Sequence, residues 1–123
     1  MRLRRSRLGT YHHRAAIPKK DSEGSSYTEY GPAVAFQAEE WPGGGKVQVE
    51  MYGNRLPNIR NLRIQEAYQE VPGAGKVSYA IKDGPVITVN DGICLYVGGD
   101  AEPDYRVVAI YPYRFLTLEV EKL

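Results

Sequence analysis

The side chains best suited to chemistry in this sequence are two adjacent histidines. On a strand, His12 and His13 point to opposite faces, so they cannot easily bind one metal ion together. No cluster of Cys, His and Asp stands near them in the sequence to complete a set of metal ligands. We therefore interpret both as polar residues of a first strand that follows a basic segment.

The acidic residues and the serines do not form a recognisable catalytic pattern either. Paired carboxylates can share acid–base work, but nothing in the sequence places two of them across one pocket. Ser22, Ser25 and Ser26 have no base signature nearby. The carboxylates in question are Glu39, Glu40, Glu66, Glu70, Asp100, Glu102 and Asp104.

A glycine-rich segment runs from Trp41 through Pro42, Gly43, Gly44 and Gly45 to Lys46. Its spacing does not match a phosphate-binding P-loop, and no Ser or Thr follows the lysine. The residues after it alternate like a strand, so we expect no helix N-terminus there to face an anion. A turn with a tryptophan anchor at a subunit contact is the preferred interpretation.

The single cysteine, Cys94, lies in the apolar run Ile-Cys-Leu-Tyr-Val, which predicts a buried, unreactive thiol. Taken together, the residue types favour a protein that is not an enzyme. We expect no metal site and no cofactor.

Composition and charge are those of one small globular domain with an asymmetric start. The chain has 123 residues, of which 42% are hydrophobic and 25% charged, with a net charge of +1. Residues 1–20 carry seven basic residues and no acid, whereas the other nine basic residues face all 15 acids, which gives −6. We predict a basic arm at residues 1–10 and a single domain at 11–123. The arm is expected to dock on another protein, with nucleic-acid contact or a solvated terminus as alternatives. No signal peptide and no membrane-spanning stretch is expected.

Short apolar segments rich in β-branched and aromatic residues, separated by Gly, Pro, Asn and Asp, predict antiparallel strands. Residues 18–32 are polar and predict a long loop or an extended hairpin tip, and residues 71–76 another loop. Residues 54–62 are the best candidate for a short helix, with Pro57 at its first position. The predicted strands cover residues 11–17, 33–39, 46–52, about 62–68, 77–81, 86–89, 93–97, 105–111 and 116–121.

In the last strand Leu116, Leu118 and Val120 are expected to face inward, and Thr117, Glu119 and Glu121 outward. A small closed barrel buries such strands without leaving open edges. The predicted fold class is therefore all-β, with at most one short helix, as a small antiparallel β-barrel with long loops.

The C-terminal block DGICLYV…PDYRVVAI…YRFLTLEVEK resembles the ending of small head–tail joining proteins of tailed phages, also called head-closure or stopper proteins. Tyr105, Val107 and Ile110 match that family's penultimate strand, and Leu116 and Leu118 its last strand. Upstream, the polar loop at 21–24, the strand at 34–38, the turn at 42–45 and the basic start follow the family's order. The resemblance covers most of the chain as an order of elements, and residues 50–70 match less well.

The resemblance implies a structural virion protein that forms a ring, a hexamer or dodecamer, in the virion neck after synthesis in the bacterial host cytoplasm. The ring would lie below the portal and its adaptor and above a tail-completion protein, and packaged DNA would touch it without sequence specificity. The implied channel loop contains Lys19, Lys20, Asp21, Glu23, Tyr27, Glu29 and Tyr30. The implied subunit or partner interface contains Arg2, Arg4, Arg5, Arg7, Trp41, Pro42, Gly43, Gly44 and Gly45.

Three alternatives stay open. The chain could be another ring component of the connector, namely an adaptor or a tail-completion protein. It could be a small nucleic-acid-binding barrel outside any virion, which would need aromatic and basic residues together on one exposed face. The net −6 of residues 21–123 disfavours that second alternative. It could also be a hydrolase with an unrecognised site.

Overall fold

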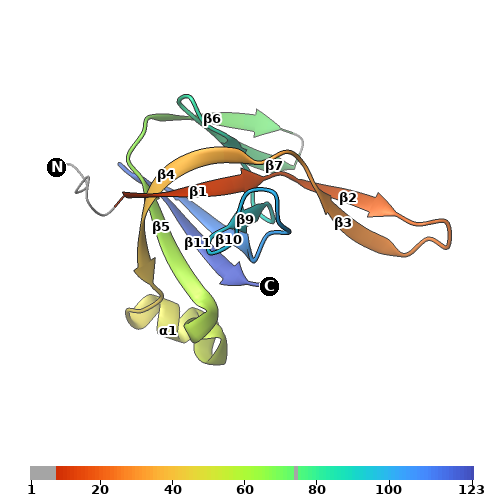
Figure 1. Cartoon of the computed structure of the whole chain (residues 1–123). Coiled ribbons are helices and arrows are strands. Elements are labelled where there is room, and N and C mark those ends of the chain that lie inside the picture. The colour runs from red at the N-terminus through yellow and green to blue at the C-terminus, as the bar shows by residue number, and fades with distance from the viewer. Residues whose placement is uncertain (1–7, 74) are drawn as a thin grey trace.

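The computed structural model describes residues 8–73 and 75–123 and shows a closed antiparallel β-barrel (Figure 1). Around the barrel, neighbouring strands follow the order β1-β4-β5-β11-β10-β9, and β9 pairs back with β1. The prediction of a small all-β barrel is therefore confirmed. The barrel strands are β1 (Leu8–Arg14), β4 (Val34–Pro42), β5 (Ile59–Ile64), β9 (Gly92–Cys94), β10 (Tyr105–Pro112) and β11 (Leu116–Lys122).

Three additions lie outside the barrel wall. A two-stranded hairpin, β2 (Ala16–Lys20) and β3 (Ser26–Tyr30), projects from one side of the molecule (Figure 1). A three-stranded sheet is formed by β6 (Tyr68–Gly73), β7 (Lys76–Ile81) and β8 (Val86–Ile87). The helix α1 (Lys46–Tyr52) and the 3-10 helix η2 (Gly53–Asn58) connect β4 to β5, away from the hairpin (Figure 1).

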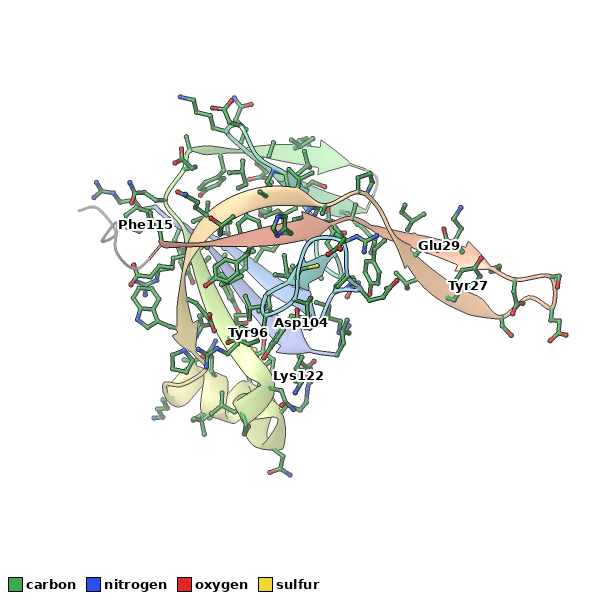
Figure 2. The ribbon with its side chains drawn as sticks, viewed as in Figure 1. Tyr27, Glu29, Tyr96, Asp104, Phe115 and Lys122 are labelled. Carbon is green, nitrogen blue, oxygen red and sulfur yellow. The ribbon has the colours of Figure 1, made fainter. Side chains whose placement is uncertain are left out.

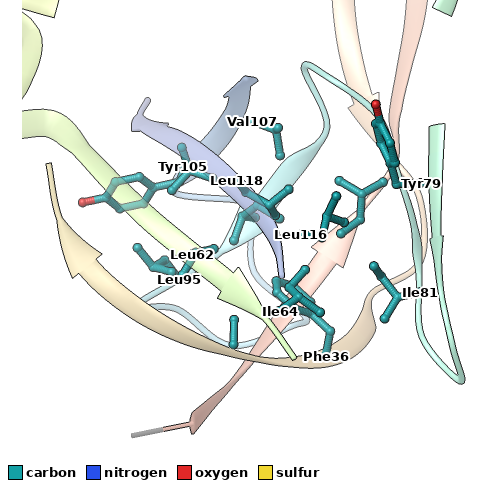
Figure 3. Packing of buried hydrophobic residues seen from close by; sticks show 14 residues of the cluster. Phe36, Leu62, Ile64, Tyr79, Ile81, Leu95, Tyr105, Val107, Leu116 and Leu118 are labelled. Carbon is teal, nitrogen blue, oxygen red and sulfur yellow. The ribbon is translucent and has the colours of Figure 1, made fainter. Parts of the chain in front are cut away.

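The core fills the barrel with the inward-facing residues that alternate along its strands (Figure 3). Leu116, Leu118 and Val120 are fully buried, as the alternation predicts. Tyr79 and Ile81 of the three-stranded sheet belong to the same cluster. That sheet is therefore packed on the barrel's core and is part of the same domain.

The prediction of a strand at residues 46–52 is wrong, because this segment forms α1. Its alternating Val47, Val49 and Met51 are typical of a strand, but none of the three is buried. Instead Gln48 and Tyr52, one helical turn apart, contact the barrel, and Gly45 enters the helix at φ 85. Tertiary contacts have overridden local β propensity.

Other boundaries differ from the predictions for local reasons. The first strand breaks at Ala15 into β1 and β2, and the helix expected at 54–62 is the 3-10 helix η2 with Pro57 near its end. Residues 71–76 are mostly strand, because β6 and β7 pair up to Gly73 and Lys76. Strand β9 ends at Cys94, so Val97, which is exposed, does not share a buried face with Ile93 and Leu95.

Glu119 and Glu121 point away from the barrel interior as predicted, yet both are buried. The cause is the helical segment, which covers this part of the outer wall. Tyr52 Oη donates to Glu119 Oε1 at 2.7 Å, and Arg55 Nε donates to Glu121 Oε2 at 2.7 Å. These two acids therefore hold α1 and η2 on the barrel.

Candidate functional site

The hairpin of β2 and β3 is exposed along almost its whole length. Residues of both faces are exposed. Figure 2 shows two of them on one face of β3, Tyr27 and Glu29. The hairpin includes all the predicted channel-loop residues. Of these residues, only Tyr30, at the base of the hairpin, is partly buried. The prediction of an extended hairpin, as the alternative to an irregular loop, is confirmed.

The tip of the hairpin is a well-defined turn. Asp21 Oδ1 accepts hydrogen bonds from the backbone N–H groups of Glu23 and Ser25, each at 2.9 Å. Gly24 adopts φ 84, a conformation that favours glycine. The Asp21 carboxylate therefore builds the turn, while Lys19, Lys20 and the other exposed hairpin acids remain available to a partner.

The two long edges of the hairpin differ. Asp21 pairs with Ser25 and Ala15 with Gly31 through backbone hydrogen bonds, so the residues that alternate with them point their backbone groups outward. On β2 this edge has few free donors, since Ala16 N–H donates to Asp91 and Pro18 has no N–H, which leaves Lys20 N–H. On β3 the edge residues Ser26 and Thr28 make no backbone hydrogen bond to another described residue on that side. The β3 edge is therefore open to a partner strand.

Asp91 anchors the base of the hairpin. This buried carboxylate accepts from Ala16 N at 2.9 Å through Oδ1, and from His13 Nε2 at 2.7 Å and Thr88 N at 2.9 Å through Oδ2. Its backbone carbonyl also accepts from Val107 N at 2.9 Å. One residue thus ties β1, β2, β10 and the end of β8 together.

Arg14 anchors the returning strand. Its guanidinium donates to three backbone carbonyl oxygens: Gly31 at 2.7 Å, Ala101 at 2.8 Å and Tyr30 at 3.1 Å. Because an arginine side chain presents its donors in a fixed planar fork, these three bonds set the direction of the chain at the end of β3. Arg14 and Asp91 together form what we call the hairpin anchor.

Gly92 allows the hairpin to sit close to the barrel. A Cβ atom at this position would lie 2.4 Å from Cγ of Pro103 and 2.9 Å from Cε1 of Tyr30. Asn90, two residues earlier, adopts φ 81, which asparagine tolerates better than most residues. The Asn90-Asp91-Gly92 turn is thus shaped to receive the base of β3.

A second exposed surface lies on the outer barrel wall beside α1, and we call it the aromatic groove. The Arg63 guanidinium lies 4.1 Å from the centroid of the Trp41 ring, and the rings of Tyr111 and Tyr113 are stacked at 5.6 Å. Tyr113 is 63% exposed and Val47 70%. The groove contains Trp41, Pro42, Gly44, Val47, Arg63, Tyr111 and Tyr113. Trp, Tyr and Arg are the residues most enriched at the centres of protein interfaces.

A buried carboxylate lies between the aromatic groove and α1. Glu119 accepts hydrogen bonds from Tyr52, Tyr111 at 3.0 Å and Gln48. The pKa of both tyrosines is raised above its usual value. Burial is the largest cause, and the hydrogen bond that each hydroxyl donates to Glu119 is the next. The neutral tyrosines are therefore retained as donors, which keeps α1 against the wall.

The structure brings some predicted site residues together and separates others. Trp41, which is half-buried, and Pro42, which is exposed, end β4 and line the aromatic groove together with Gly44. The predicted arm residues Arg2, Arg4, Arg5 and Arg7 lie outside the described residues. Cys94 is buried as predicted, and burial raises the pKa of its thiol. His13 and Asp91 were not expected to meet, since 78 positions separate them.

Searches for similar proteins give no further guide to this chain: no family model, no curated protein and no solved structure matches it. Across residues 8–73 and 75–123, no three His, Cys, Asp or Glu side chains are grouped so that they could hold a metal ion. In the same residues no helix is long and apolar enough to span a membrane.

Replacing Asp91 with Ala is expected to release the hairpin and to destabilise the fold. The change leaves three donors without their acceptor, and each buried unpaired donor costs about 1–3 kcal/mol. Urea unfolding should show this loss, and the amide of Ala16 should exchange much faster with deuterium. The matched control is Asp21→Ala at the exposed tip, which should leave exchange at Ala16 unchanged. Equal exchange at Ala16 in wild type and Asp91→Ala would contradict the anchoring role.

Replacing Arg55 with Ala is expected to raise the pKa of the Glu121 carboxyl. In the wild type, hydrogen bonding to Arg55 holds this pKa below its usual value, with a smaller contribution from Arg106. The lowered pKa contributes stability that is present above the unfolded-state pKa and is lost as pH falls through the folded-state pKa. NMR titration of the Glu121 side-chain carboxyl should show the upward shift, and the acid side of the pH–stability curve should flatten. An unchanged titration would show that Arg55 does not set this pKa.

Proposed function

We propose that this chain is a structural protein of the tailed-phage head–tail connector. Copies would form a ring below the portal and adaptor, close the DNA-filled head and offer a surface for tail attachment. The observation that carries the proposal is the projecting hairpin, anchored at its base and exposed on both faces. The connector role itself is proposed because the C-terminal block resembles head–tail joining proteins.

The hairpin is suited to line a channel that contains DNA. An isolated two-stranded ribbon gains little stability from its own residues, so a projecting ribbon with a dedicated anchor implies a partner beyond the barrel. Its charges nearly cancel, with Lys19 and Lys20 against Asp21, Glu23 and Glu29. Such a surface would neither grip phosphates tightly nor repel them strongly. The open β3 edge would allow neighbouring hairpins to meet.

The barrel would supply the body of the ring. In a ring, each subunit meets its two neighbours through two different surfaces. The aromatic groove and the exposed side of α1 are one surface of this kind, and the sheet of β6, β7 and β8 with the hairpin base is another. The remaining faces would meet the adaptor and the tail-completion protein in the virion neck.

The direct test is to delete the gene in a strain that produces the particle and to examine the products by electron microscopy. We expect emptied or leaking heads beside separate, complete tails. Complementation then tests the hairpin: in one variant, residues 20–26 are replaced by Asn-Gly between Lys19 and Tyr27, a hydrogen-bonded pair that suits a two-residue turn, so that Pro18 and Thr28 at the base are kept. This variant should restore ring attachment but not DNA retention.

The length-preserving variant Ser22→Ala is the matched control and should restore infectious particles. Normal tailed particles in the deletion strain would overturn the connector assignment. Full DNA retention with the shortened hairpin would overturn the channel role while leaving the connector assignment intact.

One observation favours a second candidate function, a small nucleic-acid-binding barrel. The aromatic groove places Trp41, Tyr111 and Tyr113 together with Arg63 on one exposed face, which is the arrangement that stacks single-stranded bases. The acidic excess of residues 21–123 works against it, since binding would have to overcome repulsion from the rest of the surface.

Fluorescence titration with single-stranded DNA at several salt concentrations separates the two candidates. A nucleic-acid-binding barrel should show salt-dependent binding that Trp41→Ala weakens, since stacking contributes about 1–3 kcal/mol per base. Tyr27→Ala on the hairpin is the matched control. The connector proposal expects no such binding by the barrel.

A further inference from the structure

Helix α1 exposes an unusual amount of apolar surface for a short surface helix. Val47 is 70% exposed, Val49 51% and Met51 54%. Only Gln48 and Tyr52 hold the helix to the barrel wall through the contacts described above. Clustered exposed apolar residues on a small domain mark a contact surface more often than chance.

The helical repeat places these side chains around a charged centre. At about 100° per residue, Glu50 lies opposite the Gln48–Tyr52 side, with Val47 and Met51 on one flank and Val49 on the other. We call Val47, Val49, Glu50 and Met51 the α1 ridge. It is convex, apolar at the sides and acidic at the crest.

A concave surface with matching character lies between the hairpin base and the sheet of β6, β7 and β8. We call it the hairpin groove, and its volume is about 900 Å³. Val86 and Val89, which are 50% and 38% exposed, provide apolar surface on the sheet side. Pro18 and Tyr30 provide it on the hairpin side. One helical turn with its side chains is about 10–12 Å across, a suitable size for such a groove.

The charged residues of the hairpin groove are complementary to Glu50. Lys76 and Arg106 line the groove, and its one acidic side chain, Asp91, is buried and bonded to three donors. The Arg106 guanidinium is only loosely held, with contacts of 3.3 Å to Asn90 and 3.5 Å to Glu121. Arg106 can therefore turn toward an incoming carboxylate, and the Lys76 side chain is exposed beside it in the groove lining.

We infer that the α1 ridge of one copy docks in the hairpin groove of the next copy. The inference rests on the proposed ring and names its two contact surfaces. Figure 1 shows α1 below the barrel and the hairpin projecting to the right, on a different side, so one copy can engage two neighbours at once. A contact between two different surfaces of the same chain propagates head-to-tail, and closes into a ring if the rotation permits.

A charge exchange tests the contact. Glu50→Lys places like charges at every junction, and so does Lys76→Glu, so each variant alone should associate about tenfold or more weakly than wild type. In an equimolar mixture, junctions between unlike variants again join opposite charges. The introduced lysine meets the introduced glutamate at one junction, and the native Glu50 meets the native Lys76 at the next. Sedimentation velocity should therefore show assembly restored in the mixture.

The matched control is Glu66→Lys, an exposed acid between β5 and β6 that lies outside both surfaces. It should assemble as wild type does. A wild-type chain that stays monomeric at millimolar concentration overturns the inference, and so does a mixture that is no better than its components.

A second measurement avoids dependence on affinity. The double variant Val49→Cys, Val86→Cys should form disulfide-linked ladders under mild oxidation, because Val49 belongs to the α1 ridge and Val86 lines the hairpin groove in which the ridge would dock. Val49→Cys with Val34→Cys, an exposed position outside the hairpin groove, should not. The native Cys94 is 1% exposed and should not interfere. Leaking heads in the deletion strain together with an absent ladder would leave the connector role standing and remove this contact alone.

Discussion

The arrangement of the whole molecule depends on how one buried carboxylate is bonded. Asp91 receives His13 from β1, the backbone of Ala16 from β2 and the backbone of Thr88 after β8. Its own carbonyl receives Val107 from β10. A carboxylate accepts but does not donate, so all these partners must converge on it as donors, and that requirement fixes their relative positions. Removing any one of them would leave a buried polar group unsatisfied.

The hairpin inherits its direction from this junction. Among its residues only Ala16 and Tyr30 are even partly buried, so no core of its own holds it. Asp91 holds the outgoing strand β2 through Ala16, just after the break at Ala15. Arg14, just before the break, holds the end of the returning strand β3 through the carbonyls of Tyr30 and Gly31. A flexible loop of this length would extend as far from the barrel, but its orientation would vary. An anchored ribbon presents the same face to a partner in every copy.

Buried carboxylates that accept hydrogen bonds also hold α1 and η2 on the barrel. Two acids of β11, Glu119 and Glu121, hold the helical segment on the outer wall, one through neutral donors and the other through Arg55. Once these contacts are made, the apolar side chains of α1 have no place to be buried within the described part of the chain. The helix is therefore stable in its position and still offers an apolar surface to a partner.

The sequence predicted the barrel well because alternation reports which strand residues face a core. Leu116, Leu118 and Val120 are an example, and their inward positions needed no knowledge of their neighbours. The segment at 46–52 alternates in the same way, yet its position is set by Glu119, 67 positions from Tyr52. The hairpin anchor was missed for the same reason, since 75 positions separate Ala16 from Asp91. Asn, Asp and Gly at positions 90–92 are residue types that favour a turn, but they do not show that the Asp91 carboxylate is an anchor.

The central claim is that the barrel holds the hairpin in a fixed direction, and backbone 15N relaxation tests it most directly. We expect order parameters near 0.85, the value of rigid backbone, for Ile17, Thr28 and Tyr30, matching the barrel strands. Lower values are expected only at the tip. Order parameters below about 0.6 along the whole hairpin would show a ribbon that moves freely on the barrel, and would contradict the account.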